Sequence, residues 1–69
     1  MTTERYEAFA LEIGDTIIRG EDLYVITEIE ISDDEYCIHL RDEEGFARHL
    51  LLGEFDKVRV LVVDHNEYA

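Results

Sequence analysis

The sequence predicts an all-β fold, in which five short antiparallel strands form a small barrel or a strongly bent sheet. Two observations predict it. Apolar residues, many of them β-branched, recur at every second position along several segments, which is the period of a β-strand. Glycines and acidic clusters separate these segments at the short intervals of tight turns. We expect the 69 residues to be one domain, with a core over about residues 8–63, a frayed N-terminus over 1–7 and a loose tail over 64–69.

The first strand is predicted where Phe9, Leu11 and Ile13 alternate with other residues, and Phe9 is expected in the core. A glycine and an aspartate interrupt this run, and a second strand follows over 16–18. The competing interpretation of the first segment is a helix over Glu4–Leu11, because its alanines and glutamates favour helix formation.

The third strand is predicted over residues 23–31, after a turn at Gly20. Its odd positions are apolar or threonine and are expected to line one face. The opposite face begins apolar and becomes acidic at Glu28 and Glu30. A strand that changes from burial on two sides to burial on one side indicates curvature.

The fourth and fifth strands are predicted to form a hairpin. A three-residue loop that ends in a left-handed Gly45 sets Asp42 opposite Phe46. This register places apolar residues against apolar residues on one side, with Ile38 opposite Leu50. The side chains expected on the other side are Cys37, His39, Ala47, His49 and Leu51. A short connection then leads to a final strand.

The chain carries 18 Asp and Glu against 6 Lys and Arg, a formal net charge of −12 at pH 7. Such a surface repels nucleic acid and anionic membranes, so the expected partner is a basic protein surface. The single cysteine permits no internal disulfide, and the start of the chain lacks the pattern of a signal peptide. No apolar run approaches the length of a membrane span. We therefore expect a cytoplasmic protein.

Three segments follow one another in a recognisable order: a Gly-Asp opening within Leu11–Ile17, then Gly20 before Tyr24–Ile26, then an acidic hairpin within Ile38–Phe46. This order resembles the small SH3-like barrels of the KOW and Tudor types, and the resemblance implies a five-stranded barrel. Many such barrels bind nucleic acid through basic or aromatic loops. The loops here are acidic, so that function does not carry over. The brevity and acidity also resemble small early proteins of bacteriophages, which implies action in a host cytoplasm.

The candidate partner-binding residues are carboxylates and one aromatic residue. Successive carboxylates on one strand face lie about 6.6 Å apart, and DNA carries one charge per roughly 3.4 Å along each strand. A row of carboxylates could therefore act as a DNA mimic that inhibits a nucleic-acid-binding protein. The alternative interpretation is that these residues only keep the loops solvated. The candidates are Glu28, Glu30, Asp33, Asp34, Glu35, Asp42, Glu43 and Glu44, with Phe46 as an apolar anchor.

A metal site is the second candidate. Cys37, His39 and His49 are expected on one face at cross-strand distance, where they could coordinate Zn²⁺. No fourth ligand is evident, because His65 belongs to the tail. The simpler interpretation is a partly buried cysteine beside two histidines, and the acidic clusters lack the spacing of a calcium loop. The sequence therefore predicts no metal and no cofactor.

Catalysis is not predicted either. The acidic setting of Cys37 disfavours a thiolate, and no phosphate-binding glycine loop or nucleophile elbow is present. A domain of this size also has little room for a pocket of about 300 Å³ or more. The predicted function is a non-catalytic module that binds and modulates or inhibits a basic protein. The alternative is an assembly subunit that self-associates through exposed strand edges, above all Val58–Val63, which is apolar on both faces.

Overall fold

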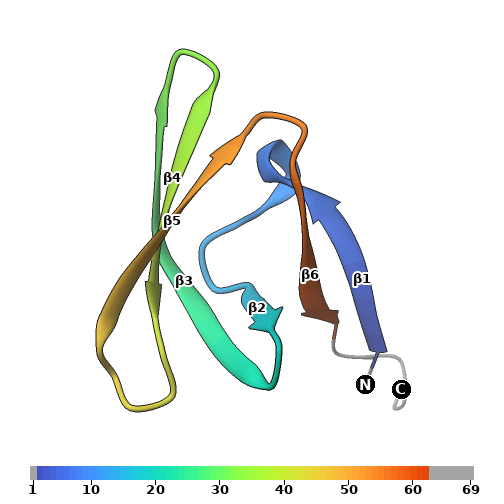
Figure 1. The fold of residues 1–69 in the computed structure, drawn as a ribbon, viewed down its shortest axis with the longest axis vertical. Coiled ribbons are helices and arrows are strands. Elements are labelled where there is room, and N and C mark those ends of the chain that lie inside the picture. Colours follow the sequence, from blue (N-terminus) through green and yellow to red (C-terminus); the bar gives the residue numbers. More distant parts are fainter. Residues whose placement is uncertain (1, 63–69) are drawn as a thin grey trace, which may run out of the picture.

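The computed structural model describes residues 2–62, which form one antiparallel sheet of six strands and a short 3₁₀ helix (Figure 1). The all-β prediction is confirmed, but the sheet has six strands where five were predicted. It is neither closed into a barrel nor strongly curled. Its strand order is β1-β6-β2-β3-β4-β5. The elements are β1 (Thr2–Glu7), η1 (Ala8–Ala10), β2 (Thr16–Arg19), β3 (Asp22–Ser32), β4 (Glu35–Arg41), β5 (Ala47–Gly53) and β6 (Lys57–Val62).

The additional strand is β1, in the segment that was predicted to fray. It pairs with β6 along its whole length, and its one large apolar side chain, Tyr6, packs against the core. This pairing places β6 between β1 and β2, so the edge position considered for Val58–Val63 is wrong over the described part of that strand. The two edges of the sheet are β1 and β5. Residue 63 and the tail predicted over 64–69 lie outside the described residues.

The segment with alternating Phe9, Leu11 and Ile13 is not a strand. Its start forms η1, which is all that the structure has of the helix considered over Glu4–Leu11. The loop that follows is held to β3 by two backbone hydrogen bonds, each 2.9 Å long. In one the Gly14 N–H donates to the Ile26 carbonyl, and in the other the Ile26 N–H donates to the Asp15 carbonyl.

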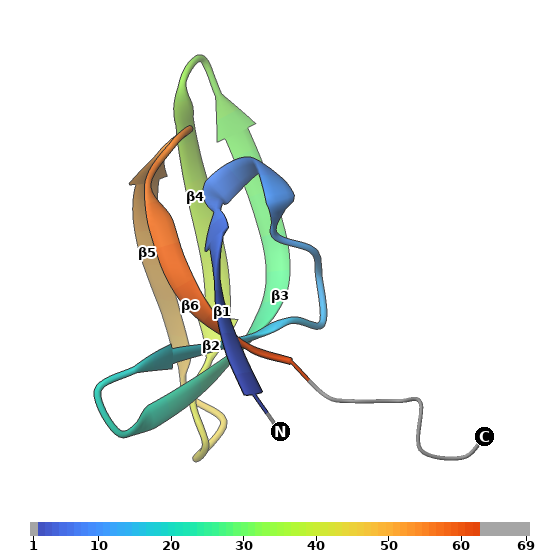
Figure 2. The same ribbon diagram turned by 90° about the vertical axis from the view of Figure 1, so that its right-hand side faces the viewer.

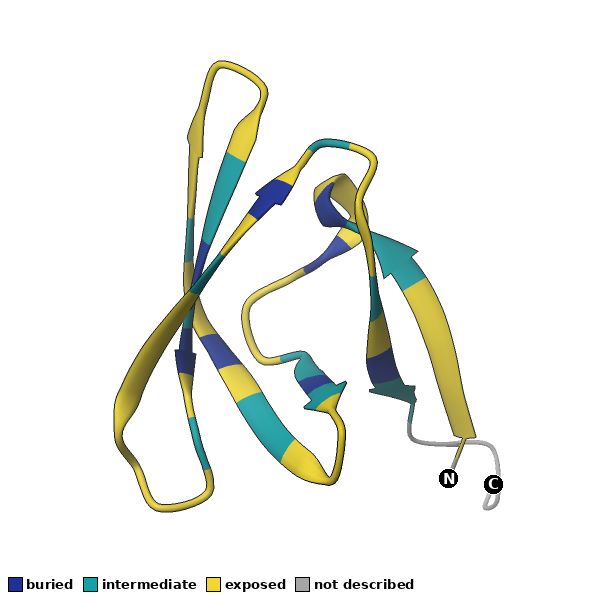
Figure 3. Cartoon of the chain, in the orientation of Figure 1, coloured by how far each residue is buried: buried dark blue, intermediate teal, exposed yellow. Residues whose placement is uncertain are grey.

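One core draws on every strand except β1, together with η1 and the loop after it (Figure 3). Ile17 and Ile38 are completely buried. Phe9, which was expected in the core, is half exposed, and its ring meets Phe55 edge-on with 6.0 Å between the ring centres. The buried residues are Ala8, Leu11, Ile17, Ile26, Ile38, Leu40, Leu52 and Val60.

A β-bulge in β3 overturns the prediction that its odd positions share one face. The register pairs Ile26 with Leu40 and Glu28 with His39, so Thr27 has no partner on β4. Even positions are therefore the more buried before the bulge, and Ile29 is the half-buried position after it. The change in burial along this strand arises from the extra residue, since a bulge reverses the alternation without closing the sheet.

The β4–β5 hairpin has the predicted register. The Asp42 N–H donates to the Phe46 carbonyl over 3.1 Å, and Gly45 has a φ of +90°. The left-handed glycine and the apolar cross-strand pairs therefore set the alignment as expected. The paired positions include Tyr36 with Leu52, Ile38 with Leu50, and His39 with His49.

Candidate functional site

The two turns that carry most of the predicted partner-binding residues lie at opposite ends of β4 (Figure 2), and Glu28 and Glu30 lie along β3 between them. Asp33 and Asp34 form the β3–β4 turn, whereas Asp42, Glu43 and Glu44 belong to the β4–β5 turn. The strand between them has seven residues, and at roughly 3.3 Å per residue it separates the turns by about 23 Å. The structure therefore does not bring the predicted residues together as one surface.

The carboxylates near the β3–β4 turn are mostly free. Among residues 2–62, the side chains of Asp33, Asp34 and Glu35 are exposed and form no ion pair. Glu28 and Glu30 are both exposed and share the outer face of β3, as predicted. Glu30 is already engaged, because its Oε1 lies 2.9 Å from Nε2 of His39.

Asp42 is different, because it organises the β4–β5 turn. Its Oδ1 accepts hydrogen bonds from the backbone N–H groups of Glu44 (3.0 Å) and Phe46 (2.9 Å), and its Oδ2 accepts one from Nε of Arg48 (3.2 Å). The Phe46 N–H is the largest cause that holds the pKa of Asp42 below its ordinary 3.8; Glu44 and Arg48 act in the same direction, and burial opposes them. Asp42 therefore shapes the turn and is not a free ligand for a partner.

The β4–β5 turn meets the β2–β3 turn around a shallow hollow of about 210 Å³, which we call the acidic hollow. Sequence analysis missed this meeting, although the signal was present. In a meander of antiparallel strands, alternate turns lie at the same end of the sheet. Phe46, the predicted anchor, is 60% exposed but does not line the hollow. The lining residues are Asp22, Leu23, Tyr24, Asp42, Glu43, Glu44 and Arg48.

The charges of the acidic hollow are largely uncompensated. Among residues 2–62, its only ion pair joins Arg48 to Asp42, which leaves Asp22, Glu43 and Glu44 without a cationic partner. All three are exposed. Tyr24 is half-buried, packs against the core and lines the same hollow. Carboxylates beside an aromatic ring are the groups that bind an ammonium or guanidinium group.

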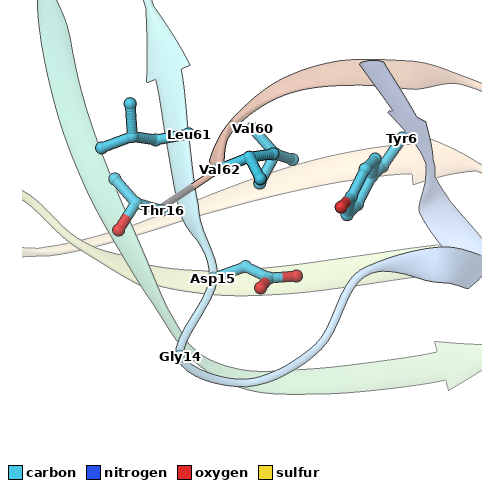
Figure 4. Close-up of a pocket in the computed structure, with 7 residues that line it drawn as sticks. All are labelled: Tyr6, Gly14, Asp15, Thr16, Val60, Leu61 and Val62. Atoms are coloured by element: carbon cyan, nitrogen blue, oxygen red, sulfur yellow. The ribbon is translucent and has the colours of Figure 1, made fainter. Parts of the chain in front are cut away.

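A second hollow, of about 300 Å³, lies between β1, β6 and the start of β2 (Figure 4). From the size of the domain, a pocket of this volume was not expected, so that expectation was wrong. Asp15 and Tyr6 supply its acidic groups, and Asp15 Oδ2 also accepts a hydrogen bond from the Glu12 N–H over 2.9 Å. Histidine, cysteine and lysine are absent from the described residues of its lining, which are Tyr6, Gly14, Asp15, Thr16, Val60, Leu61 and Val62.

A cluster of potential metal ligands occupies the outer face of β3 and β4. Cys37 Sγ lies 3.8 Å from Nε2 of His39, and Glu30, Cys37 and His39 each place one donor atom within 4.8 Å of the other two. Sequence analysis had grouped the cysteine and this histidine with His49, which does pair with His39 across β4–β5 but is not part of this cluster. Counting back from the turn at Asp33 would have placed Glu30 opposite Cys37.

Comparison with protein-family models, with curated proteins and with solved structures found no match. Within residues 2–62, no helix has the length and apolar character to span a bilayer.

Proposed function

We propose that this protein is a non-catalytic module of the cytoplasm that binds a basic protein surface and modulates or inhibits that protein. The acidic hollow is the observation that carries this proposal. Its exposed carboxylates, Asp22, Glu43 and Glu44, have no cationic partner among residues 2–62 and line the same hollow as Tyr24. A lysine or arginine side chain of a partner supplies the charge that this site lacks.

Binding would use the hollow as a preformed receptor. The guanidinium or ammonium group would stack on Tyr24 and donate hydrogen bonds to the carboxylates of Glu43 and Glu44. Because Asp42 already holds the turn through two backbone N–H groups, less conformational entropy is lost on binding than in a mobile loop. The net charge of −12 would speed encounter with a basic surface, and added salt would weaken that effect.

The basic groove of a nucleic-acid-binding protein fits this chemistry, because such a groove is lined with cations that neutralise phosphates. In that case the module would inhibit by occupying the groove, as a DNA mimic does. The free carboxylates of the β3–β4 turn, about 23 Å from the hollow, would then add long-range attraction without forming the specific contact.

The test is a salt-eluted pulldown from cytoplasmic extract with three immobilised baits. They are the wild-type chain, Glu43→Gln/Glu44→Gln, and the charge-matched control Asp34→Asn/Glu35→Gln at the opposite end of β4. We expect one stoichiometric basic protein to bind wild type and control, to elute at moderate salt, and to be lost from the Glu43/Glu44 variant. Equal loss from both variants would show that only net charge matters. Asp42 is left intact because the turn depends on it.

The alternative function, self-assembly through a strand edge, is now favoured at β5 and no longer at the last strand. Among the described strands, β5 has β4 as its only neighbour, and its Leu51 is 57% exposed. An unprotected edge of this kind can pair with a second chain. If assembly is the function, Leu51→Lys should shift the chain from oligomer to monomer in size-exclusion chromatography with light scattering. A wild-type chain that is monomeric at high concentration would exclude it.

A further inference from the structure

We propose that Glu30, Cys37 and His39 form a binding site for Zn²⁺ on the outer face of the sheet, with the remaining coordination position open to solvent. The site joins the C-terminal part of β3 to the middle of β4. The site shares no residue with the acidic hollow, so the zinc proposal does not depend on the proposed function.

The local fold places these three side chains on one face. The tight β3–β4 turn pairs Glu30 with Cys37, and His39 follows two residues later on the same face of β4. The bulge residue Thr27 then fixes the strand beside His39, because its hydroxyl donates a hydrogen bond to the His39 carbonyl over 3.2 Å. The backbone therefore holds all three ligands from two adjacent, hydrogen-bonded strands.

The distances are close to those of a zinc site. Tetrahedral Zn²⁺ with Zn–S near 2.3 Å and Zn–N near 2.0 Å sets its sulfur and nitrogen ligands roughly 3.6 Å apart, and its nitrogen and oxygen ligands roughly 3.3 Å apart. Cys37 Sγ lies 3.8 Å from His39 Nε2, and His39 Nε2 lies 2.9 Å from Glu30 Oε1. These two pairs need shifts of only a few tenths of an ångström, and Sγ lies within 4.8 Å of the Glu30 carboxylate, whose exposed side chain can move toward the ion.

The chemistry of the donors also fits. A thiolate, an imidazole and a carboxylate together suit a borderline-soft ion such as Zn²⁺ better than Mg²⁺ or Ca²⁺, which prefer oxygen alone. The ionised Glu30 can only accept a hydrogen bond, so Nε2 of His39 carries the proton that it donates to Oε1. Zn²⁺ would bind Nε2 in place of that proton, which moves to Nδ1 of the same ring, and the thiol proton would be released to solvent. The side chains of His39 and Glu30 are 37% and 63% exposed, so the ion can enter.

Cobalt provides the direct test, because Co²⁺ enters zinc sites and reports on its ligands. The reduced full-length chain is titrated with CoCl₂, and ZnCl₂ is then added. We expect a sulfur-to-cobalt charge-transfer band and intense tetrahedral d–d bands that saturate at one equivalent and disappear when Zn²⁺ displaces Co²⁺. At a hundredfold excess over Kd, Zn²⁺ should also raise the thermal midpoint by roughly 10 °C or more.

Variants distinguish Co²⁺ binding at the proposed three-ligand site from nonspecific binding of Co²⁺ to the cysteine thiol alone. Cys37→Ser should lose the charge-transfer band, and Glu30→Gln and His39→Gln should each weaken Co²⁺ binding at least about tenfold, the smallest loss usual even for second-shell groups. His49→Gln is the matched control, and it should change the affinity less than about twofold. The proposal is overturned if no charge-transfer band forms at one equivalent. It is also overturned if Glu30→Gln and His39→Gln bind Co²⁺ like the wild type.

Discussion

The two turns that flank β4 are both acidic, yet they differ in what their carboxylates do. In the β4–β5 turn, Asp42 accepts two backbone N–H groups and an arginine, and so fixes the loop. In the β3–β4 turn, the side chains of Asp33 and Asp34 form no ion pair among residues 2–62, and Asp33 itself takes a left-handed φ of +54°. The two turns look alike when only their acidic residues are counted. They differ in their hydrogen bonds, because, of their carboxylates, only that of Asp42 is bonded to the backbone of its own turn within the described chain.

One carboxylate that is hydrogen-bonded to its own turn can fix the positions of the carboxylates next to it in the sequence. Because Asp42 orders its turn, Glu43 and Glu44 are held beside Tyr24 at the acidic hollow. Among residues 2–62, the side chains of Asp33 and Asp34 in the other turn accept no such backbone hydrogen bonds. We therefore propose recognition at the β4–β5 end and solvation at the β3–β4 end.

The largest effect should come from the core beneath both turns. Ile38 of β4 is fully buried, and Ile38→Ala should reduce the free energy of unfolding by roughly 2–5 kcal/mol through lost burial and a cavity. Urea denaturation measures this change, and Ile38→Val, with an expected loss of about 0.5–1.5 kcal/mol, keeps the test possible if the alanine variant does not fold. Ile31→Ala is the control, since Ile31 is 62% exposed. Equal losses at the two positions would contradict the assigned core.

Removing one carboxylate from each turn should change the thermal midpoint differently: it should fall for the β4–β5 turn and should not fall for the β3–β4 turn. Asp42→Ala leaves the N–H groups of Glu44 and Phe46 without their acceptor, so the thermal midpoint should fall. Asp34→Ala removes only a repulsive charge from a chain of net charge −12, so its midpoint should stay or rise. Thermal unfolding followed by circular dichroism compares the two. A similar fall in both variants would mean that the turns are equivalent.

The left-handed residues offer a smaller contrast. Gly20 and Asp33 each occupy the first central position of a two-residue turn, with φ of +64° and +54°. Glycine adopts this conformation without strain and aspartate does not, so Asp33→Gly should stabilise the fold by about 1 kcal/mol, and Gly20→Ala should destabilise it by a similar amount. Urea midpoints test both, and a destabilising Asp33→Gly would show that strain does not limit this turn.

The pH dependence of stability should report on the hydrogen bonds of Asp42. Its lowered pKa means that the carboxylate stabilises the folded state above the ordinary value of 3.8, and that this contribution is lost as the pH falls through the folded-state pKa. The midpoint difference between wild type and Asp42→Asn should therefore be constant well above pH 3.8 and shrink below it. A pH-independent difference for Asp42→Asn would contradict the network.

The sequence was a good guide where turn chemistry and apolar pairing agreed. Gly45 and the apolar cross-strand pairs identified the β4–β5 register, and Gly20 identified its turn. Prediction failed at β1, whose sequence has almost no apolar alternation, because its pairing depends on the backbone of a strand far along the chain. It failed at Phe9 because period-two spacing continued through a 3₁₀ turn that leaves this ring half exposed.

The candidate sites were harder to predict because they depend on contacts between elements. Glu43 and Glu44 were among the predicted carboxylates, but only the topology shows that Asp22 and Tyr24 line the same hollow. The cluster around Cys37 depended on the register of the β3–β4 hairpin. That register follows from a two-residue turn, Asp33-Asp34, which pairs Ser32 with Glu35. The bulge at Thr27 interrupts the apolar alternation of β3, so the sequence pattern of this strand did not reveal the register.

The most direct test of the central claim compares the two turns in one experiment. The ¹⁵N-labelled full-length chain is titrated with a short arginine-rich peptide at moderate salt, and amide shift changes are followed by NMR. The account predicts saturable changes at Tyr24, Glu43 and Glu44, with much smaller changes at Asp33 and Asp34. Changes of equal size at both turns, without saturation, would show that the hollow does not select cations and would contradict the account.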